Sequence, residues 1–239
     1  MPEKVAMISQ PFSFYLRHNR YSFFMQIQLE NVIPIPLRDK VVSRTSGIWN
    51  QRVVFGPADW IKIKAPSGTG KTTLMNMLYK LRHDYEGNIL WGIKNIKEIT
   101  GVELADKRQQ QISVIFQDMR LFSNLTAREN IELKRVLDKP MYEPGKIDEM
   151  AERLGISSIL HQRAGICSYG EQQRIAIIRS LMQPFKWLIM DEPFSHLDKA
   201  NTAKAAALIG EECKLRNAGF ILTDLDDDDN FIYTHHYTL

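Results

Sequence analysis

Two adjacent carboxylates, Asp191 and Glu192, end the apolar segment "WLIM" within "WLIMDEPFSHLD", Trp187 to Asp198. A short apolar run stopped by a proline is typical of a buried strand, which places both acids at the edge of a sheet. Ligands of α/β proteins bind at the carboxyl ends of such strands. The acids alone do not decide the chemistry, because solvated carboxylates at a strand end give the same pattern.

A second motif, "APSGTGKTT", lies between the strand-like segment "WIKIK" and a helix that we expect to begin near Thr72. This spacing, in a strand-to-helix connection, is typical of a phosphate-binding loop. Glycines let the backbone N–H groups turn toward phosphates, and the helix N-terminus adds a positive dipole. The residues expected to bind a nucleotide are Ala65, Pro66, Ser67, Gly68, Thr69, Gly70, Lys71, Thr72 and Thr73.

Together the two motifs predict chemistry on a nucleoside triphosphate such as ATP. Lys71 is expected to reach the β- and γ-phosphates, and the Thr72 hydroxyl to bind Mg²⁺. In such proteins an acid that ends a later strand holds the magnesium, a role that falls to Asp191. Glu192 is then placed to activate the attacking water as a general base. Ala65 stands where the pattern has its first glycine, and its small side chain makes this a mild departure.

The composition is that of an ordinary folded protein. A hydrophobic content of 44%, a charged content of 25% and a net charge of +3 argue against a disordered chain and against a strong nucleic-acid footprint. The two cysteines, Cys167 and Cys213, lack metal-ligand spacing and are expected to be reduced thiols, with Cys167 a small buried residue. No apolar segment approaches the roughly 20 residues that span a bilayer.

Apolar runs alternate with helical patterns along most of the chain, which predicts an α/β fold. Within "TAREN", Thr126 and Glu129 have the spacing of a capping box. Residues 1–24 are aromatic and basic but do not resemble a signal peptide, and we interpret them as an extension, with Met25 the natural start. The expected strands are Ile27 to Val32, Trp60 to Lys64, Ile112 to Phe116, Leu188 to Asp191 and Phe220 to Thr223.

The segment "CSYGEQQRIAIIRSL", Cys167 to Leu181, resembles the signature of the ATP-binding subunits of ABC transporters. That signature is usually written LSGGQ and is followed by a helix bearing glutamine and arginine. The residues in register are Ser168, Gly170, Gln172, Gln173 and Arg174. The resemblance covers roughly Met25 to Asp224 with several motifs in the family's order, which is more specific than any single motif.

The resemblance implies a P-loop NTPase (RecA-like) α/β core with an antiparallel β-subdomain and a helical subdomain insertion. The cassette would occupy residues 25–239, with the helical subdomain at approximately 117–170. Gln117 corresponds to the Q-loop glutamine, which contacts Mg²⁺ and has a catalytic role beside Lys71 and Glu192. "SHLD", Ser195 to Asp198, resembles the D-loop at the dimer interface. In this family two ATP molecules lie between two subunits, so Ser168 and Gly170 are expected to act on the partner's ATP.

Several positions depart from the family's pattern. Tyr169 replaces the first signature glycine, and Glu171 replaces the glutamine. "NVIPIPLRDK" has no aromatic residue to stack on adenine, so Trp49 or Phe55 is left as a substitute. In "GFILTDLDDDD" the switch histidine is missing, with Asp224 or Leu225 at the nearest positions, and slow hydrolysis is therefore one expectation. His196, His235 and His236 are interpreted as surface or packing residues, and Asp226 to Asp229 as a solvated loop.

The sequence therefore predicts an ATPase subunit of an ABC transporter that uses ATP and Mg²⁺. It is most similar to the branch of lipoprotein-release, macrolide-export and cell-division ATPases. Expected partners are a second ATPase subunit, as a homodimer or paired subunit, and integral-membrane permease subunits, with no nucleic acid. The expected location is the cytoplasmic face of the membrane. An ATP-dependent interaction module with weak or no hydrolysis stays open as the alternative, and a soluble P-loop kinase is disfavoured by the signature helix.

Overall fold

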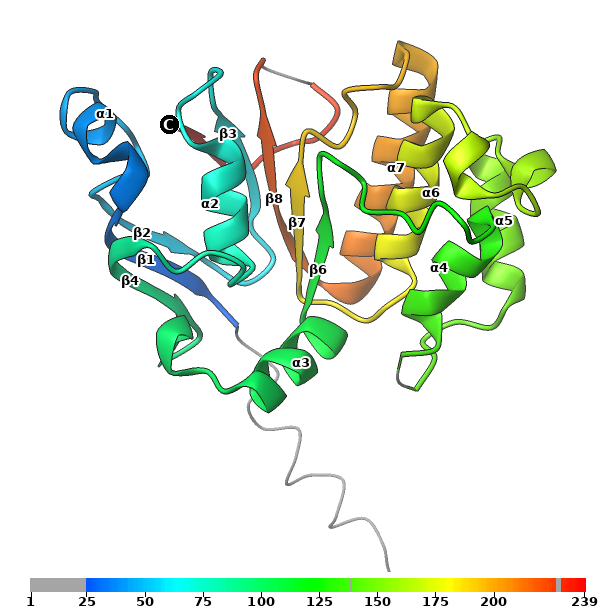
Figure 1. The fold of residues 1–239 in the computed structure, drawn as a ribbon, viewed down its shortest axis with the longest axis horizontal. Coiled ribbons are helices and arrows are strands. Elements are labelled where there is room, and N and C mark those ends of the chain that lie inside the picture. The colour runs from blue at the N-terminus through cyan, green and yellow to red at the C-terminus, as the bar shows by residue number, and fades with distance from the viewer. Residues whose placement is uncertain (1–24, 138, 227–228) are drawn as a thin grey trace, which may run out of the picture.

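The computed structural model describes residues 25–137, 139–226 and 229–239 (Figure 1). The extension interpreted at residues 1–24 lies outside these residues, as do Asp227 and Asp228 of the acidic run. Within the described part, no helix combines the length and the apolar character needed to cross a membrane.

Two sheets organise the described residues. A parallel sheet has the strand order β6-β7-β8-β3-β9, and an antiparallel sheet has the order β2-β1-β4-β5. The α/β fold with a separate antiparallel sheet is therefore as the sequence predicts. The strands are β1 (Ile27–Pro34), β2 (Arg52–Phe55), β3 (Trp60–Lys64), β4 (Tyr85–Trp91), β5 (Lys94–Asn95), β6 (Ile112–Ile115), β7 (Trp187–Asp191), β8 (Gly219–Asp224) and β9 (His235–Thr238).

Helices cover both faces of the parallel sheet. In Figure 1, α2 lies between the two sheets, whereas α6 and α7 pack on the opposite face of the parallel sheet. Capping boxes begin α3, α4 and α6, and the one at Thr126 and Glu129 is as predicted. The helices are α1 (Arg38–Val42), α2 (Lys71–Leu78), α3 (Gly101–Gln110), α4 (Ala127–Arg135), α5 (Gly145–Arg153), α6 (Tyr169–Leu181) and α7 (Lys199–Arg216).

The strand predictions from the sequence missed four strands, β2, β4, β5 and β9. In β4, "YEGNILW", the alternation is broken by Gly87, whose φ is +79°. A Cβ atom at Gly87 would meet the Asn31 carbonyl oxygen at 2.3 Å, next to the point where the register of β1 and β4 shifts. β9, "HHYT", is an edge strand with largely exposed side chains, so it carries no apolar signal. Both strands depend on contacts that local sequence does not encode.

Two hydrophobic cores hold the layers together. One joins α4, α5, α6 and α7 to the parallel sheet, and the other joins α2 and the antiparallel sheet to its opposite face. Strand β7 lies between them and is buried at all five positions. The apolar run that precedes Asp191 is therefore explained by burial on both faces of the sheet.

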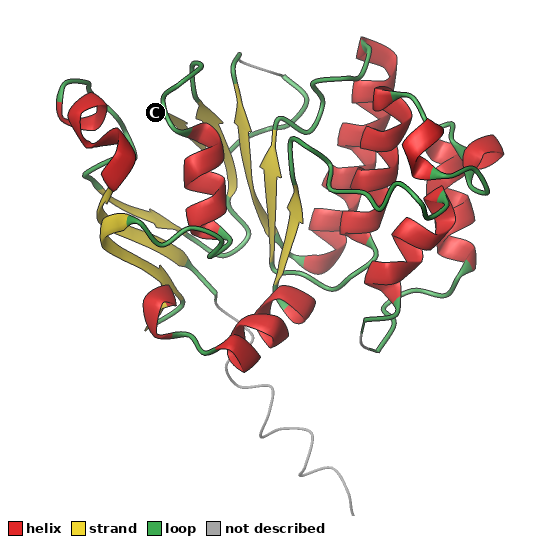
Figure 2. Cartoon of the chain, in the orientation of Figure 1, coloured by secondary structure: helices red, strands yellow, loops and turns green. Residues whose placement is uncertain are grey.

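A mainly helical region follows β6 and packs against α6, at the right of Figure 2. Its boundaries as a subdomain at 117–170 stay a prediction. The loop that enters it is held by Asn130 of α4, which is fully buried. The Asn130 side chain accepts from the Phe122 N–H at 2.8 Å and donates to the carbonyls of Phe122, Leu125 and Thr126 at 3.0, 3.3 and 3.0 Å.

We expect Asn130→Ala to lower the free energy of unfolding by about 2–4 kcal/mol, because it removes these hydrogen bonds and leaves buried backbone groups unpaired. Urea denaturation of the full chain measures the change. Asn88→Ala, at an exposed position on β4, is the control and should cost no more than about 0.5 kcal/mol. Equal losses for the two variants would contradict the role of Asn130.

Candidate functional site

The loop between β3 and α2 has the backbone shape that phosphate binding requires. Gly68 and Gly70 have φ values of +77° and +101°, in the left-handed region that favours glycine. A Cβ atom at Gly70 would lie 2.6 Å from the Leu37 Cδ1 atom, so a larger residue there would have to displace the Leu37 side chain as well as adopt a strained backbone conformation. The loop begins at buried Ala65, whose N–H donates to the Asp224 carbonyl at 2.9 Å, and it runs into the N-terminus of α2 at Lys71.

A pocket of about 370 Å³ lies over this loop and the first turn of α2. It brings residues of the loop together with Gln117, Glu192 and Leu225, which come from the ends of three parallel strands. Ala65, Pro66 and Thr69 belong to the loop but do not line the pocket. Its lining is Ser67, Gly68, Gly70, Lys71, Thr72, Thr73, Gln117, Glu192 and Leu225.

Lys71 and Glu192 contact each other in this pocket as an ion pair. Both residues are only 8% exposed, so each charge depends on the other. Glu192 has a φ of +46°, an uncommon conformation for this residue type, and its N–H donates to the Thr223 carbonyl at 3.0 Å. A phosphate that binds Lys71 would therefore compete with the Glu192 carboxylate for this ammonium group.

Asp191 is the buried acid of the pair, at 2% exposure. Its Oδ1 atom accepts from the Thr223 hydroxyl at 2.8 Å, and the Thr72 hydroxyl also hydrogen-bonds the carboxylate. Burial raises the pKa of Asp191 above its usual range, while these two hydroxyls and the nearby Lys71 ammonium act in the opposite direction. A bound cation would favour the ionised carboxylate in the same way.

The oxygen ligands around Asp191 fit Mg²⁺. Thr72, Gln117 and Asp191 share a cavity of about 220 Å³ beside the phosphate pocket. Mg²⁺ is usually held by one or two carboxylates together with substrate phosphates and water, so a single acid with a hydroxyl and an amide is a suitable set. Among the described residues there is no cluster of three or more His, Cys, Asp or Glu side chains that could hold a metal ion.

Asp224, at the position nearest the missing switch histidine, does not line the phosphate pocket; the neighbouring Leu225 does. The Asp224 carboxylate lies 3.8 Å from the Nζ atom of Lys62, a lysine that is buried in β3. The sequence raises the concern that negative charge at this position would repel phosphate. The Lys62 ammonium group offsets the negative charge of the Asp224 carboxylate. The apolar side chain of Leu225 lines the pocket in place of the missing histidine.

The signature residues lie apart from the phosphate pocket of their own chain. Ser168 caps α6, and Gly170 approaches the His196 carbonyl so closely that a Cβ atom would lie 2.9 Å from that oxygen. Glu171 accepts from the Ser168 N–H at 2.8 Å and from its hydroxyl at 2.8 Å. The unusual Glu171 therefore completes a capping box. Ser168 and Gly170 are not brought to Lys71, so their action on a partner's nucleotide stays a prediction.

Gln173 has a structural role that the sequence did not reveal. It is fully buried, its Nε2 atom donates to the Glu192 carbonyl at 3.1 Å, and its Oε1 atom accepts from the His196 N–H at 3.0 Å. One side chain thus fixes the segment after β7 to the signature helix. One feature of the sequence could have indicated this role, because Gln173 is a polar residue on the face of α6 that includes the buried Ala176 and Ile177.

Neither aromatic residue considered for adenine stacking is free for that role in the structure. Phe55 is buried and packs edge-on against Tyr237, with 5.7 Å between ring centroids. Trp49 is 3% exposed, and its Nε1 atom donates to the Thr69 carbonyl at 3.1 Å, so it supports the phosphate loop from behind. Cys167 is buried as predicted, and burial raises the pKa of its thiol.

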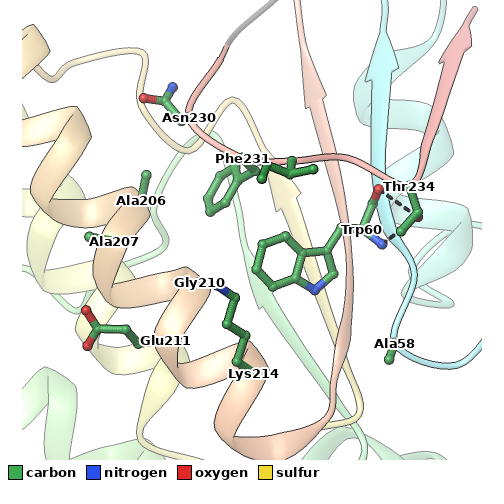
Figure 3. A pocket seen from close by; sticks show the side chains of 11 residues that line it. Ala58, Trp60, Ala206, Ala207, Gly210, Glu211, Lys214, Asn230, Phe231 and Thr234 are labelled. Atoms are coloured by element: carbon green, nitrogen blue, oxygen red, sulfur yellow. Dashed lines mark hydrogen bonds between the residues drawn. The ribbon is translucent and has the colours of Figure 1, made fainter.

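A separate cavity of about 570 Å³ lies between α7 and residues 230–234 (Figure 3). The Trp60 indole and the Phe231 ring point toward each other in it, and the Thr234 hydroxyl hydrogen-bonds the Trp60 backbone at 2.9 and 3.0 Å. No residue of the predicted site lines this cavity, so it is not part of the phosphate-binding arrangement.

Comparisons with known proteins agree with this geometry. A family model described as ABC transporter matches residues 50–195. The ABC transporter ATP-binding protein YvcR of Bacillus subtilis is 32% identical over 170 residues, which are 70% of this chain and 66% of YvcR, a little under two thirds of that relative. The lipoprotein-releasing system ATP-binding protein LolD 2 of Chlorobaculum tepidum is 30% identical over 179 residues, 72% of each chain.

A solved structure shares the fold. The dimeric structure of MJ0796, described as a bacterial ABC transporter cassette, superposes with a TM-score of 0.69 over 84% of this chain and 88% of that one. The two sequences are 23% identical, so this likeness concerns the fold.

We expect Thr223→Val to weaken Mg²⁺-dependent nucleotide binding by roughly tenfold, because it removes a hydrogen bond that orients the Asp191 carboxylate and favours its ionised form. Titration of a fluorescent ATP analogue at several Mg²⁺ concentrations measures this effect. Thr202→Val, in the first turn of α7, is the matched control. A loss of affinity that persists without Mg²⁺ would show that Thr223 acts on the nucleotide by another route.

Proposed function

Because this chain belongs to the ABC transporter family, we propose that it is an ATP-binding subunit that hydrolyses ATP with Mg²⁺ between two paired subunits and moves membrane partners. The observation that carries the proposal is the meeting of Lys71, Thr72, Gln117, Asp191 and Glu192 around two adjoining cavities at the carboxyl end of the parallel sheet. These residues come from α2 and from the ends of β6 and β7, so the fold itself assembles them.

Each side chain has a defined task in the proposed reaction. Lys71 binds the terminal phosphates, and the N-terminus of α2 adds its positive dipole. Thr72, Gln117 and Asp191 supply the oxygen atoms that hold the metal. Mg²⁺, when bound, neutralises charge on the phosphate oxygens.

Glu192 is the general base of the proposal. The Lys71 contact gives its carboxylate a partner until phosphate takes that ammonium. Once released, the carboxylate accepts a proton from the water that attacks the γ-phosphorus atom, and the products are ADP and inorganic phosphate. Hydrolysis in this arrangement does not need a histidine at Asp224, because the base comes from β7.

The second half of each site comes from a paired subunit in this proposal. Ser168 and Gly170 lie at the N-terminus of α6, a helix of 13 residues whose first N–H groups present positive charge. That helix end, presented to a partner's γ-phosphate, makes ATP a bridge between subunits. Hydrolysis removes the bridge, and separation of the subunits moves integral-membrane partners at the cytoplasmic face of the membrane.

Lys71→Ala should weaken ATP binding at least about 100-fold, because a buried cation that contacts phosphate is lost. Glu192→Gln should bind ATP, lose turnover and accumulate as a dimer. Filter binding, Mg²⁺-dependent phosphate release and light scattering measure the three properties. Parental turnover by Glu192→Gln would exclude Glu192 as the base. ATP-driven dimerisation of the parent without turnover, alone or with its membrane partner, would favour the interaction module.

A mixture of two inactive variants tests whether the signature acts across the dimer. Ser168→Asp places negative charge beside Glu171 and toward a partner's phosphate, so it should inactivate the homodimer. When it is mixed with Lys71→Ala, the hybrid dimer combines one doubly damaged site with one intact site. Phosphate release should reappear in the mixture, at up to about half the parental rate per hybrid dimer. No recovery, with hybrid dimers verified by differential tags, would place Ser168 in the site of its own chain.

A further inference from the structure

The cavity between α7 and residues 230–234 differs from the phosphate pocket, because aromatic rings form its wall (Figure 3). The Trp60 and Phe231 rings meet edge-on at 88°, with 5.8 Å between their centroids. The fully buried Phe220 packs against both rings, at centroid distances of 4.9 and 4.8 Å. The volume of about 570 Å³ falls in the range of small-molecule sites. The cavity therefore has the size and the apolar wall that a small ligand needs.

The aromatic wall is held in place by the chain itself. The Trp60 Nε1 atom donates to the Ala218 carbonyl at 3.3 Å. The Thr234 hydroxyl accepts from the Trp60 N–H at 2.9 Å and donates to the Trp60 carbonyl at 3.0 Å. Phe231 is only 9% exposed. Because these side chains are already ordered, a ligand that packs on them does not have to immobilise them.

The opposite wall is α7, which carries small residues where it faces the rings. Ala206, Ala207 and Gly210 line the cavity from this helix. A Cβ atom at Gly210 would lie 3.6 Å from the Trp60 ring and 3.8 Å from the Phe231 ring, so longer side chains on this face of α7 would fill the space. The open volume thus depends on short side chains facing fixed rings.

The turn before β3 adds a methyl group to the cavity at a strained position. The Gly56 carbonyl accepts from the Asp59 N–H at 3.2 Å, and the Gly56 N–H donates to the Asp59 carboxylate at 2.6 Å. Within this turn Ala58 has a φ of +64°, in the left-handed region where glycine is favoured. Ala58 lines the cavity. Residues held in such conformations cluster at ligand sites, so the turn is a second indication of binding, independent of the rings.

One cation in the cavity has its charge unpaired. The Lys214 Nζ atom lies 5.6 Å from the centroid of the Trp60 ring. In Figure 3 the Lys214 side chain runs between α7 and the indole, whereas Glu211 points away from the rings. The Glu211 carboxylate accepts from Arg153 at 2.7 and 2.8 Å, so its charge is already paired. Among the residues that the structure describes, the Lys214 ammonium forms no hydrogen bond or ion pair.

From this geometry we infer that the cavity binds a small aromatic carboxylate. The ring of the ligand packs edge-on against Trp60 and Phe231, as these two rings pack against each other. The carboxylate pairs with the Lys214 ammonium. A cationic ligand is disfavoured, because Lys214 already occupies the position over the indole face. This site goes beyond the proposed function, since its lining shares no residue with the phosphate pocket.

The probe for this inference is 4-phenylbutyrate. Two matched compounds, 4-phenylbutyramide and 4-phenylbutylamine, carry a neutral and a cationic group in place of the carboxylate. Tryptophan fluorescence of the full chain reports binding, because Trp60 is partly exposed while the other three of the four tryptophans are at most 3% exposed. We expect a saturable change with a Kd of about 1 mM or lower for the carboxylate, at least about threefold tighter than for the amide, and the weakest binding for the amine.

Two pairs of variants on α7 locate the ligand. Lys214→Met should lower the affinity for the carboxylate to that for the amide, whereas Lys204→Met, at an exposed position outside the lining, should retain the preference. Ala207→Phe places a ring in the cavity from an exposed position, so it should weaken binding of both compounds at least about tenfold. Ala203→Phe, one turn earlier and also exposed, should bind like the parent. Thermal unfolding verifies that each variant is folded.

Several results would overturn the site: equal binding of the carboxylate and the amide, tightest binding of the amine, an unchanged preference in Lys214→Met, or unchanged affinity in Ala207→Phe. Displacement of 4-phenylbutyrate by ATP would place the probe in the phosphate pocket and would also overturn the inference. ATP binding by the parent is measured in parallel without the probe. Its failure would remove the proposed function, while the 4-phenylbutyrate results would still decide the cavity.

Discussion

The hydrogen-bonded carboxylate of Asp191 is the constraint on which the candidate site depends. A buried charge is costly unless it is paired or hydrogen-bonded. Here the hydroxyls come from Thr223 on the neighbouring strand and Thr72 on α2. Asp191 and Thr223 are directly paired in the parallel register of β7 and β8, so a slip of one residue would turn the hydroxyl to the other face of the sheet. The register of the two strands therefore sets the geometry of the candidate metal site.

The residues of the candidate site were easier to predict from the sequence than the contacts that support them. The spacing of Gly68, Gly70 and Lys71 between a strand and a helix defined the loop, and the apolar run before Asp191 placed both acids at a sheet edge. Local patterns of this kind are set by backbone conformation and burial, which a short segment encodes. The pairing of Glu192 with Lys71 joins residues 121 positions apart, and no local pattern predicts it.

The positions that differ from the family's pattern acquire physical explanations in the structure. Glu171 is accommodated as the second half of a capping box, where a carboxylate near a helix N-terminus is favourable. The Ser168 hydroxyl donates to the Glu171 carboxylate, so it would have to change its hydrogen-bond partner before it could donate to a phosphate. The sequence shows that Asp224 stands near the position of the missing histidine. Its pairing with Lys62 could not be predicted, because it depends on the pairing of the parallel strands β3 and β8.

The bridge made by Gln173 has a consequence for how two paired subunits communicate. One amide joins the backbone at Glu192, which belongs to a chain's own phosphate pocket, to the helix that begins at Ser168 and Gly170. In a dimer that helix would face the nucleotide of the other site. The nucleotide bound at one site would therefore bias the position of Glu192, the proposed general base, at the other site. Such coupling is reciprocal by thermodynamic necessity. Two such sites in a dimer would then be coupled through the buried Gln173 amide of each chain.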